Sequence, residues 1–271
     1  QVLSEVPQIT KLQNLLFYSM KNDQVYFKQK QYIKWLKQIF LKRVVFHSMI
    51  KQSRYVEVQS GHVIEYISDF IDTSSKRFFI KNDIELNEDL FERPKHYFFS
   101  EKIRFLYIVG PHFEYLHKNF SDFVSAMSIL KKQNINFEIA ITLTKEQLQN
   151  SSLWDQTLDD ITIFLGYMPK NELHKQFCDN TILISTSVIE TIGLHVIEAI
   201  QHGILAIVPR ERYSLDVYGK EIKTYEIFNA HSLAGSFKEI SLLNNDDIAF
   251  TVEKLQKHLL VNENNKIKSI D

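Results

Sequence analysis

Two glutamates and a glycine in the segment 181–209 are spaced so that they could bind a phosphorylated sugar compound. Glu190 follows a predicted strand in a short loop, and Gly193 opens a predicted helix that carries Glu198. Unpaired N–H groups and the dipole at a helix start favour a phosphate, and glycine lets a diphosphate approach the backbone. Because carboxylates accept hydrogen bonds from sugar hydroxyls, we expect a nucleotide sugar, with Glu190 at the sugar ring and Glu198 at the ribose.

The elements that must position these residues alternate between strand and helix. Predicted strands cover 103–109, 136–143, 160–166, 181–186, 204–209 and 224–228, and predicted helices cover 121–132, 171–177, 192–203 and a segment from Ser232. Continuous apolar runs are typical of strands buried on both faces. The alternation predicts an α/β fold, a Rossmann-type parallel sheet with helices on both faces. In such a sheet, ligands bind beyond the carboxyl ends of the strands. Ser121 is the expected N-cap of the first of these helices.

The first hundred residues are less regular and predict a partial second α/β domain before the sheet. The predicted helices there are 10–22, 25–43 and 62–70, and the predicted strands are 55–60 and 76–82. The polar, charged segment 87–102 contains Pro94 and suits an interdomain linker. We therefore expect three parts: a partial N-terminal domain over 1–95, a donor-binding domain over 96–250, and a C-terminal helix and tail over 251–271.

The pattern S-x-x-E-T-x-G-L-x-x-x-E-A-x-x-x-G resembles the donor-site motif of retaining glycosyltransferases of the GT-B fold, glycosyltransferase family 4. It is formed by Ser187, Glu190, Thr191, Gly193, Leu194, Glu198, Ala199 and Gly203. The resemblance starts near residue 103 and covers most of the rest of the chain, and residues 55–82 look like the end of the family's acceptor domain. It implies transfer of a sugar from a nucleoside-diphosphate donor to a hydroxyl of a glycan or lipid-linked acceptor, with retention.

Two further segments, 107–120 and 165–177, carry the resemblance. In YIVGPHFEYLHKNF (107–120), Gly110 and Lys118 match, but Pro111 stands where the family has an arginine that helps to hold the diphosphate. Arg210 is a candidate for the missing charge on position alone. The resemblance makes Glu190 and Lys118 the catalytic residues.

The same resemblance implies the remaining donor-site residues. Donor binding is expected from Gly110, Tyr167, Met168, Thr191, Ile192, Gly193, Leu194 and Glu198. Tyr167 and Met168 would lie at the nucleotide base. His195 falls in the first turns of the phosphate-binding helix, where it could approach the donor. A histidine in such a place is more often structural or exposed than catalytic. No metal site and no cofactor are expected besides the UDP- or GDP-linked donor as substrate.

Other functions stay open beside this one. The replaced arginine and the incomplete first domain favour a silent GT-B-like scaffold or nucleotide-sugar binding protein that assists a partner enzyme. Taken singly, Glu190 and Glu198 could be solvated carboxylates. A dinucleotide oxidoreductase is disfavoured, because no G-x-G-x-x-G follows a predicted strand.

Composition narrows the class of protein. The chain has 271 residues, 44% of them hydrophobic, and a formal charge of −1. That balance argues against nucleic acid as a partner, and a single cysteine excludes an internal disulfide. No apolar run is long enough to span a membrane, so we expect a cytoplasmic protein. Abundant Lys, Asn, Ile and Phe hint at a bacterial source and at surface polysaccharide synthesis.

The segment from Lys21 to Arg54 is basic and aromatic, with only Asp23 opposing its positive charges. One reading is a helix with a core face and a solvated lysine face. The other is an interfacial helix that rests on anionic lipid, which would give the protein peripheral contact with the inner face of the plasma membrane.

Overall fold

The structure is a computed structural model of the chain, and it describes residues 8–81, 86 and 88–266. Its internal contacts define two units, which we describe separately. The first unit comprises Gln1–Leu86, Ile189–Ile192 and Val261–Asp271, and the second comprises Asn87–Val188 and Gly193–Leu260. The domain limits 1–95, 96–250 and 251–271 stay a prediction. Residue 82 of the expected strand 76–82 and residues 267–271 of the expected tail lie outside the described residues.

The second unit is built on a six-stranded parallel sheet with the order β6-β5-β4-β7-β8-β9. Its strands are β4 (Ile103–Tyr107), β5 (Phe137–Ile141), β6 (Thr162–Phe164), β7 (Thr181–Ile184), β8 (Leu205–Pro209) and β9 (Lys223–Tyr225). Leu106 of β4 pairs with Ala140 on one side and Leu183 on the other. The order reverses between β4 and β7, so the carboxyl ends of these two strands form the switch point where doubly wound sheets bind ligands.

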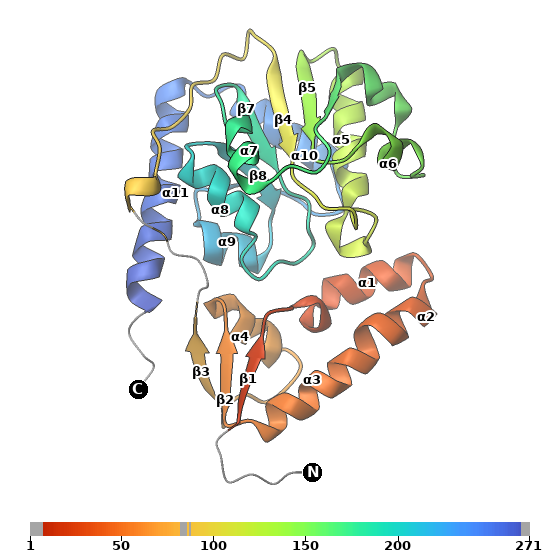
Figure 1. Cartoon of the computed structure of the whole chain (residues 1–271), viewed down its shortest axis with the longest axis vertical. Helices are drawn as coiled ribbons and strands as arrows, with labels where there is room; N and C mark the ends of the chain where they lie inside the picture. The colour runs from red at the N-terminus through yellow and green to blue at the C-terminus, as the bar shows by residue number, and fades with distance from the viewer. Residues whose placement is uncertain (1–7, 82–85, 87, 267–271) are drawn as a thin grey trace. The chain divides into compact units, whose positions relative to one another are not determined.

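Helices connect the strands of this sheet, and two more, α10 (Ala230–Ile240) and α11 (Asn245–Lys266), follow its last strand. The connecting helices are α5 (Phe120–Lys132), α6 (Lys145–Gln149), α7 (Lys170–Leu173), α8 (Leu194–Gln201) and α9 (Arg212–Tyr218). Figure 1 shows α8 and α9 in front of the sheet and α10 behind it. Every residue of β7 and β8 is buried, which explains why all of them except Thr181 are apolar. This agrees with the predicted α/β sheet with helices on both faces, which is confirmed.

The core of the second unit fills the space between the sheet, α5 and α10. Phe105 of β4 packs its ring edge-on against Phe237 of α10, with centroids 4.9 Å apart. Tyr107 stacks on Phe123 of α5 at 4.2 Å. Both strand residues belong to one buried apolar cluster, whereas the equally buried Leu106 between them lies outside it. Alternate residues of β4 therefore face opposite layers of helices.

The segment 87–102, predicted to be a linker, belongs to the second unit, and Tyr97 is one of the residues that hold it there. Tyr97 is 3% exposed. Its hydroxyl donates to the carbonyl of Thr181 at 2.8 Å and accepts from the N–H of Leu205 at 2.9 Å. The side chain thus bridges the starts of β7 and β8. Burial raises the pKa of the Tyr97 hydroxyl, which keeps its proton available for this bond.

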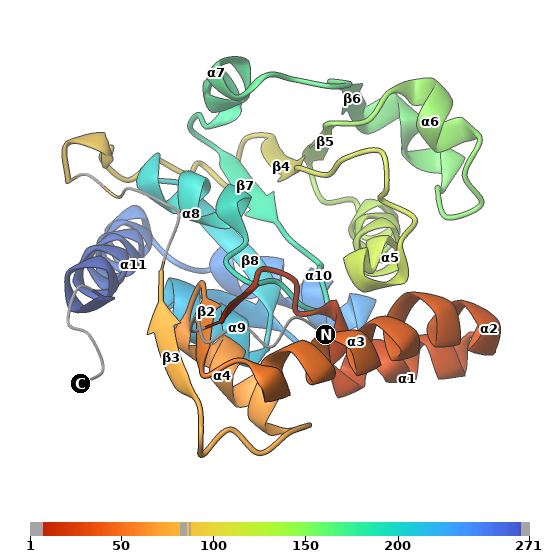
Figure 2. The ribbon, with the colours of Figure 1, turned by 60° about the horizontal axis from the view of Figure 1, so that its bottom comes forward.

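The first unit contains a three-stranded parallel sheet and a helical hairpin. The strands β1 (Ile9–Leu12), β2 (Tyr55–Val58) and β3 (Arg77–Ile80) lie in that order. Between β1 and β2 come α1 (Met20–Lys28), α2 (Tyr32–Trp35), a π-helical turn (Leu36–Phe40) and α3 (Leu41–Gln52), and α4 (Gly61–Ser68) follows β2. Figures 1 and 2 both show α1 running alongside α2 and α3, which continue one another.

Asp23 joins the two arms of the hairpin. Its carboxylate accepts two hydrogen bonds from the guanidinium of Arg43, at 2.7 and 2.8 Å, and one from the indole N–H of Trp35 at 2.8 Å. The single acidic residue of the basic segment is therefore a structural link between α1 and α3.

Two local predictions were wrong, and two short helices were not predicted. Residues 10–22 do not form one helix: Thr10 and Leu12 are buried in β1, because pairing with β2 outweighs local helical spacing, and α1 begins only at Met20. Ser121 is not the N-cap of α5. Asn119 occupies that place in a left-handed conformation and makes no side-chain cap bond. The short helices α6 and α9 were not predicted, since 5 and 7 residues show too little periodicity.

Among the described residues, no helix is both long and apolar enough to cross a membrane.

Candidate functional site

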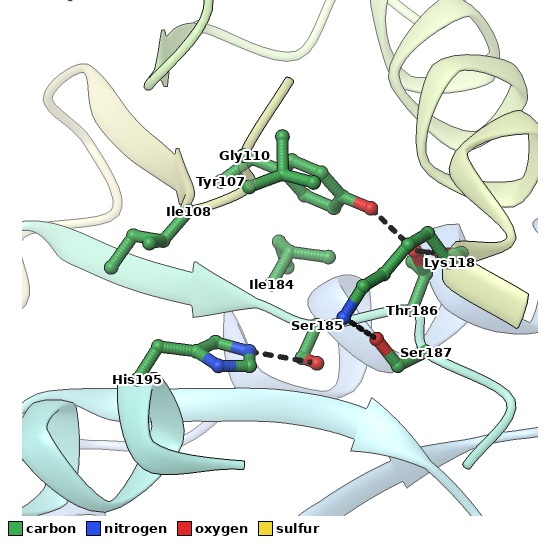
Figure 3. Close-up of a pocket in the computed structure, with 10 residues that line it drawn as sticks. Tyr107, Ile108, Gly110, Lys118, Ile184, Ser185, Thr186, Ser187 and His195 are labelled. Carbon is green, nitrogen blue, oxygen red and sulfur yellow. Dashed lines mark hydrogen bonds between the residues drawn. The ribbon is translucent and has the colours of Figure 1, made fainter. Parts of the chain in front are cut away.

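A cavity of about 230 Å³ lies at the carboxyl ends of β4 and β7, within the second unit (Figure 3). It is lined by Tyr107, Ile108, Val109, Gly110, Lys118, Ile184, Ser185, Thr186, Ser187 and His195. This is the switch point of the sheet, so topology and cavity indicate the same place. Gly110 and Lys118, both predicted donor-site residues, are among the lining residues.

Three consecutive hydroxyl residues extend β7 along one side of the cavity. Ser185, Thr186 and Ser187 are all buried, and buried hydroxyls require hydrogen-bond partners. The Oγ of Ser185 lies 3.1 Å from Nε2 of His195. The Oγ of Ser187 accepts from Nζ of Lys118 at 3.5 Å. The two side chains that can carry positive charge are thus both attached to this segment.

The turn that carries Lys118 is held to the same segment through its backbone. The Oγ1 of Thr186 donates to the carbonyl of Lys118 at 2.8 Å, and the N–H of Val188 donates to the carbonyl of His117 at 2.7 Å. Since Thr186 uses its only proton in this bond, the hydroxyl of Tyr107, 2.7 Å away, must be the donor to Thr186. This chain of hydrogen bonds fixes the position of the Lys118 backbone.

The residues after Lys118 anchor the other end of the turn. Asn119 is buried with φ 48° and donates from Nδ2 to Oδ2 of Asp122 at 2.6 Å. That oxygen also accepts from the N–H of Phe228 at 2.8 Å. Burial raises the pKa of Asp122, and these hydrogen bonds lower it, with burial the larger effect. Lys118 is therefore presented by a rigid turn.

The helix predicted to hold the phosphate begins as expected. Gly193 precedes α8 with φ 63° and ψ 60°, a left-handed conformation that favours glycine, and no side chain caps the helix. Leu194 is exposed. Gly110 is also open: no described atom lies within 4 Å of the place where a Cβ would stand.

The remaining donor residues of the second unit lie outside the cavity lining. The carboxylate of Glu198 pairs with Nζ of Lys170 at 2.7 Å. Tyr167 is 91% exposed, and Met168 is half-buried. Both follow Gly166, whose φ is +64°. Arg210 lines a different cavity, with Glu226 3.3 Å from its guanidinium; the structure does not bring it to the cavity at Gly110.

Glu190, Thr191 and Ile192 belong to the first unit. The Oγ of Ser60 donates to the carbonyl of Thr191 at 3.1 Å, and Nε2 of His62 lies 3.2 Å from the carbonyl of Glu190. Ser60 and His62 are both buried. The backbone that carries Glu190 is therefore held by the start of α4.

Sequence reasoning missed several of these residues. Ser60 and His62 follow β2 at the start of a helix, the same strand-to-helix position that identified Glu190 and Gly193, so position was an available signal. Tyr107 gave no signal, because a tyrosine at the end of an apolar run is indistinguishable from core. Ser185 and Thr186 were visible only as the end of a strand, and Ser187 only as the first residue of the motif.

Comparisons with known proteins agree with this fold. The family profile described as "Glycosyl transferases group 1" matches residues 91–248, which is more than half of the chain. A search of curated protein sequences found no match.

Solved structures resemble the chain, including the following three. Sucrose-phosphate synthase from Thermosynechococcus elongatus has a TM-score of 0.68 at 16% identity, over 96% of this chain and 65% of that one. A TarM mutant from S. aureus, in complex with Fondaparinux, alpha-GlcNAc-glycerol and UDP, has a TM-score of 0.60 at 17% identity, over 97% and 51%. A trehalose-6-phosphate synthase studied for glycosyl transfer with retention has a TM-score of 0.60 at 10% identity, over 83% and 62%.

The chain spans less than two thirds of the length of each of these three proteins. The structural likeness shows the GT-B fold, and the profile shows the family. The chain belongs to the family of group 1 glycosyl transferases.

Proposed function

We propose that this chain binds a nucleoside-diphosphate sugar and transfers the sugar to a hydroxyl of a glycan or lipid-linked acceptor, with retention at the anomeric carbon. The observation that carries the proposal is the cavity at the switch point of the sheet, where Gly110 leaves open space and Lys118 presents a positive charge beside the start of α8. The named relatives support it, since one was solved with UDP and another was studied for retention.

In this proposal the diphosphate is held by charge and by backbone donors. Lys118 and the N–H groups at the start of α8, from Ile192 to Leu194, would stabilise the negative charge that grows as the bond to the anomeric carbon breaks. The rigid turn under Lys118 would hold that charge in place before the reaction. The acceptor oxygen then bonds to the anomeric carbon on the face that the diphosphate leaves, and the diphosphate takes the acceptor's proton.

The proposed roles of the other residues concern orientation. Glu190 would position the sugar through its hydroxyls. Glu198 would accept from the ribose, and its bond to Lys170 keeps its carboxylate oriented. Tyr167 and Met168 would lie at the base. The donor is UDP- or GDP-linked in this proposal, and neither metal nor cofactor is assigned a role. A part in bacterial surface polysaccharide synthesis stays a prediction from composition.

A thermal-shift screen tests donor binding. The chain is heated with UDP, GDP, ADP, CMP and their sugars, and the screen is repeated with Lys118→Ala and with the control Lys132→Ala on the exposed face of α5. A ligand at a hundred times its dissociation constant adds about 2.7 kcal/mol to the free energy of unfolding. We expect a shift that persists in the control and fades in Lys118→Ala. No shift with any nucleotide would refute the proposal for this chain.

Turnover and binding are separated by Glu190→Ala. If Glu190 acts on the sugar, the variant loses turnover by about a hundredfold or more while its affinity for the nucleotide alone changes little. Wild-type rates in the variant would remove the catalytic assignment. Tight binding by the wild-type chain without transfer to any acceptor would instead favour the silent nucleotide-sugar binding protein.

We also propose that the helical hairpin of the first unit rests on an anionic lipid surface. Between Gln24 and Val56 there are eight Lys and Arg residues and no Asp or Glu. Exposed apolar side chains form a stripe along α2 and α3, at the spacing of one helix face: Ile33, Leu36, Phe40, Leu41, Val44, Val45 and Met49. We call these seven residues the apolar stripe. The positive charge of the hairpin and the apolar stripe along it together suit an anionic headgroup region. In this proposal the protein is cytoplasmic and contacts the inner face of the plasma membrane.

Co-sedimentation with vesicles tests this surface. We expect binding to phosphatidylglycerol vesicles, loss of binding to phosphatidylcholine vesicles, and loss with the double variant Leu41→Ser, Val44→Ser. Absence of binding to the anionic vesicles would contradict the proposal. Concentration-dependent dimers that the same double variant abolishes would show that another copy of the chain, not lipid, covers the stripe.

A further inference from the structure

Two turns with a left-handed backbone meet at the carboxyl group of Asp122. Asn119, directly after Lys118, has φ 48°, and Phe228, in the turn between β9 and α10, has φ 61°. Such values are uncommon outside glycine, and they persist where the surrounding structure holds them. Oδ2 of Asp122 accepts from Nδ2 of Asn119 at 2.6 Å and from the N–H of Phe228 at 2.8 Å. One oxygen therefore joins the turn that carries the lysine to the turn after β9.

The side chains of Asn119 and Asp122 do not make the usual bonds of a helix start. Asn119 is the N-cap of α5, where the side-chain oxygen normally accepts from a backbone N–H of the first turn, but this bond is absent. In a capping box, a carboxylate at the position of Asp122 would accept from the N–H of the N-cap residue. Here that N–H donates to the carbonyl of Leu116 at 3.2 Å. Both side chains instead join the two turns, which favours a role in placing the turn over a role in capping α5.

The carboxyl group of Asp122 acts from outside the donor cavity. Asp122 is 7% exposed and is not among the residues that line the cavity, whereas Lys118 lines it (Figure 3). The backbone of Lys118 has a second anchor, because its carbonyl accepts from Oγ1 of Thr186 at 2.8 Å. Burial raises the pKa of the Asp122 carboxyl, since a buried charge costs free energy unless hydrogen bonds compensate it. Keeping an acidic group at this place is therefore costly, and its hydrogen bonds to the two turns offset that cost.

We propose that Asp122 is a positioning residue for donor binding: by tying the turn at Asn119 to the turn at Phe228, it holds the ammonium group of Lys118 where the diphosphate binds. This inference rests on the proposed donor binding. A lysine side chain has many rotamers, so the place of its charge depends on how firmly its backbone is held. A charge fixed before the ligand arrives stabilises the diphosphate most. The turn after β9, which lies outside the cavity, would thus affect the donor through this one carboxyl group.

A double-mutant cycle separates positioning from a general structural role. Isothermal titration measures the dissociation constants of UDP-glucose and GDP-mannose for the full chain, for Lys118→Ala, for Asp122→Ala and for the double variant. We expect Asp122→Ala to weaken binding of the probe about tenfold in the presence of Lys118, and by no more than about twofold in its absence. The effect of Asp122 on affinity would then pass through the lysine.

Two further variants control for folding and for the loss of a helix-start carboxylate. Asp122→Asn keeps the size and one acceptor oxygen, so it should stay folded and recover part of the affinity that Asp122→Ala loses. If Asp122→Ala does not fold, the same cycle with Asp122→Asn decides, with an expected loss of about threefold that depends on Lys118. Asp247 is the third residue of α11, as Asp122 is of α5, but it is exposed. Asp247→Ala should bind like the wild type. Melting without ligand shows which variants are folded.

The outcomes distinguish this inference from the function beneath it. If Asp122→Ala weakens binding equally with and without Lys118, or leaves it unchanged, the positioning role is refuted and donor binding stands. If Lys118→Ala binds as tightly as the wild type, the lysine does not hold the donor, and Asp122 cannot act through it. A wild-type chain that binds neither probe would also overturn the inference, and the nucleotide screen then shows whether donor binding itself fails.

Discussion

The two units bury their apolar residues to very different extents. In the second unit every residue of β7 and β8 is buried, and α10 is packed against both α5 and the sheet. In the first unit β3 alternates between exposed and half-buried residues, and Val45 of the apolar stripe is 57% exposed. Exposed apolar patches of this kind mark interaction surfaces. The second unit thus completes its own core, whereas the first presents the apolar stripe, which we expect a lipid surface or another molecule to cover.

The largest expected effect comes from removing Asp23 in the first unit. Asp23→Ala leaves the buried guanidinium of Arg43 without its carboxylate, and breaking such a pair costs about 3–5 kcal/mol. Hydrogen exchange followed by mass spectrometry should show lost protection in α1 and α3, with β4 and β7 of the second unit unchanged. Asp72→Ala, at an exposed aspartate of the same unit, is the control. Equal loss in both units would mean that they unfold together.

Two glycines of the second unit should respond in opposite directions when each is replaced by alanine. Gly203 has φ +75°, and a Cβ there would stand 2.2 Å from the carbonyl oxygen of Arg93. Gly203→Ala should lower the free energy of unfolding by about 2–4 kcal/mol. Gly235 lies inside α10, with no described atom within 4 Å of its Cβ position. Gly235→Ala should therefore stabilise by up to about 1 kcal/mol. Urea unfolding measures both, and equal effects would contradict the prediction.

A smaller, pH-dependent effect should come from Asp122. Because burial raises its pKa in the folded state, the unfolded chain loses this proton first as the pH rises. Stability therefore falls between the ordinary carboxyl pKa near ~4 and the higher folded value. Asp122→Asn removes this dependence. The difference in free energy of unfolding, variant minus wild type, should rise by about 1 kcal/mol or less from pH 4 to pH 7, and a flat difference would exclude the effect.

The smallest effect on stability is expected at the apolar stripe. Leu41→Ser and Val44→Ser replace exposed side chains, so each should change the free energy of unfolding by no more than about 0.5 kcal/mol. A larger loss in urea unfolding would show that the stripe is packed within the chain, and the contrast between the two units would then disappear.

How much of the site could be predicted depended on how local its signals were. Gly110 and Gly193 lie near a strand end and at a helix start, and these positions follow from apolar runs of a few residues, whereas Lys118 follows from the family resemblance of segment 107–120. Tyr107 and Thr186 are 79 residues apart, and nothing in either segment indicates their hydrogen bond. His195 was noted only as near the expected phosphate, and its bond to Ser185 depends on how the residues after β7 turn.

The sequence by itself determined the alternation of strands and helices, the α/β class and the motif around Glu190 and Glu198, because each is a pattern of hydrophobicity or residue type over short spans. Only the tertiary structure decided that β1 is a strand, that Tyr97 bridges β7 and β8, and that Lys118 and His195 share one cavity. Strand pairing and buried hydrogen bonds join residues far apart in the chain. Their free energy depends on desolvated partners that a local pattern does not contain.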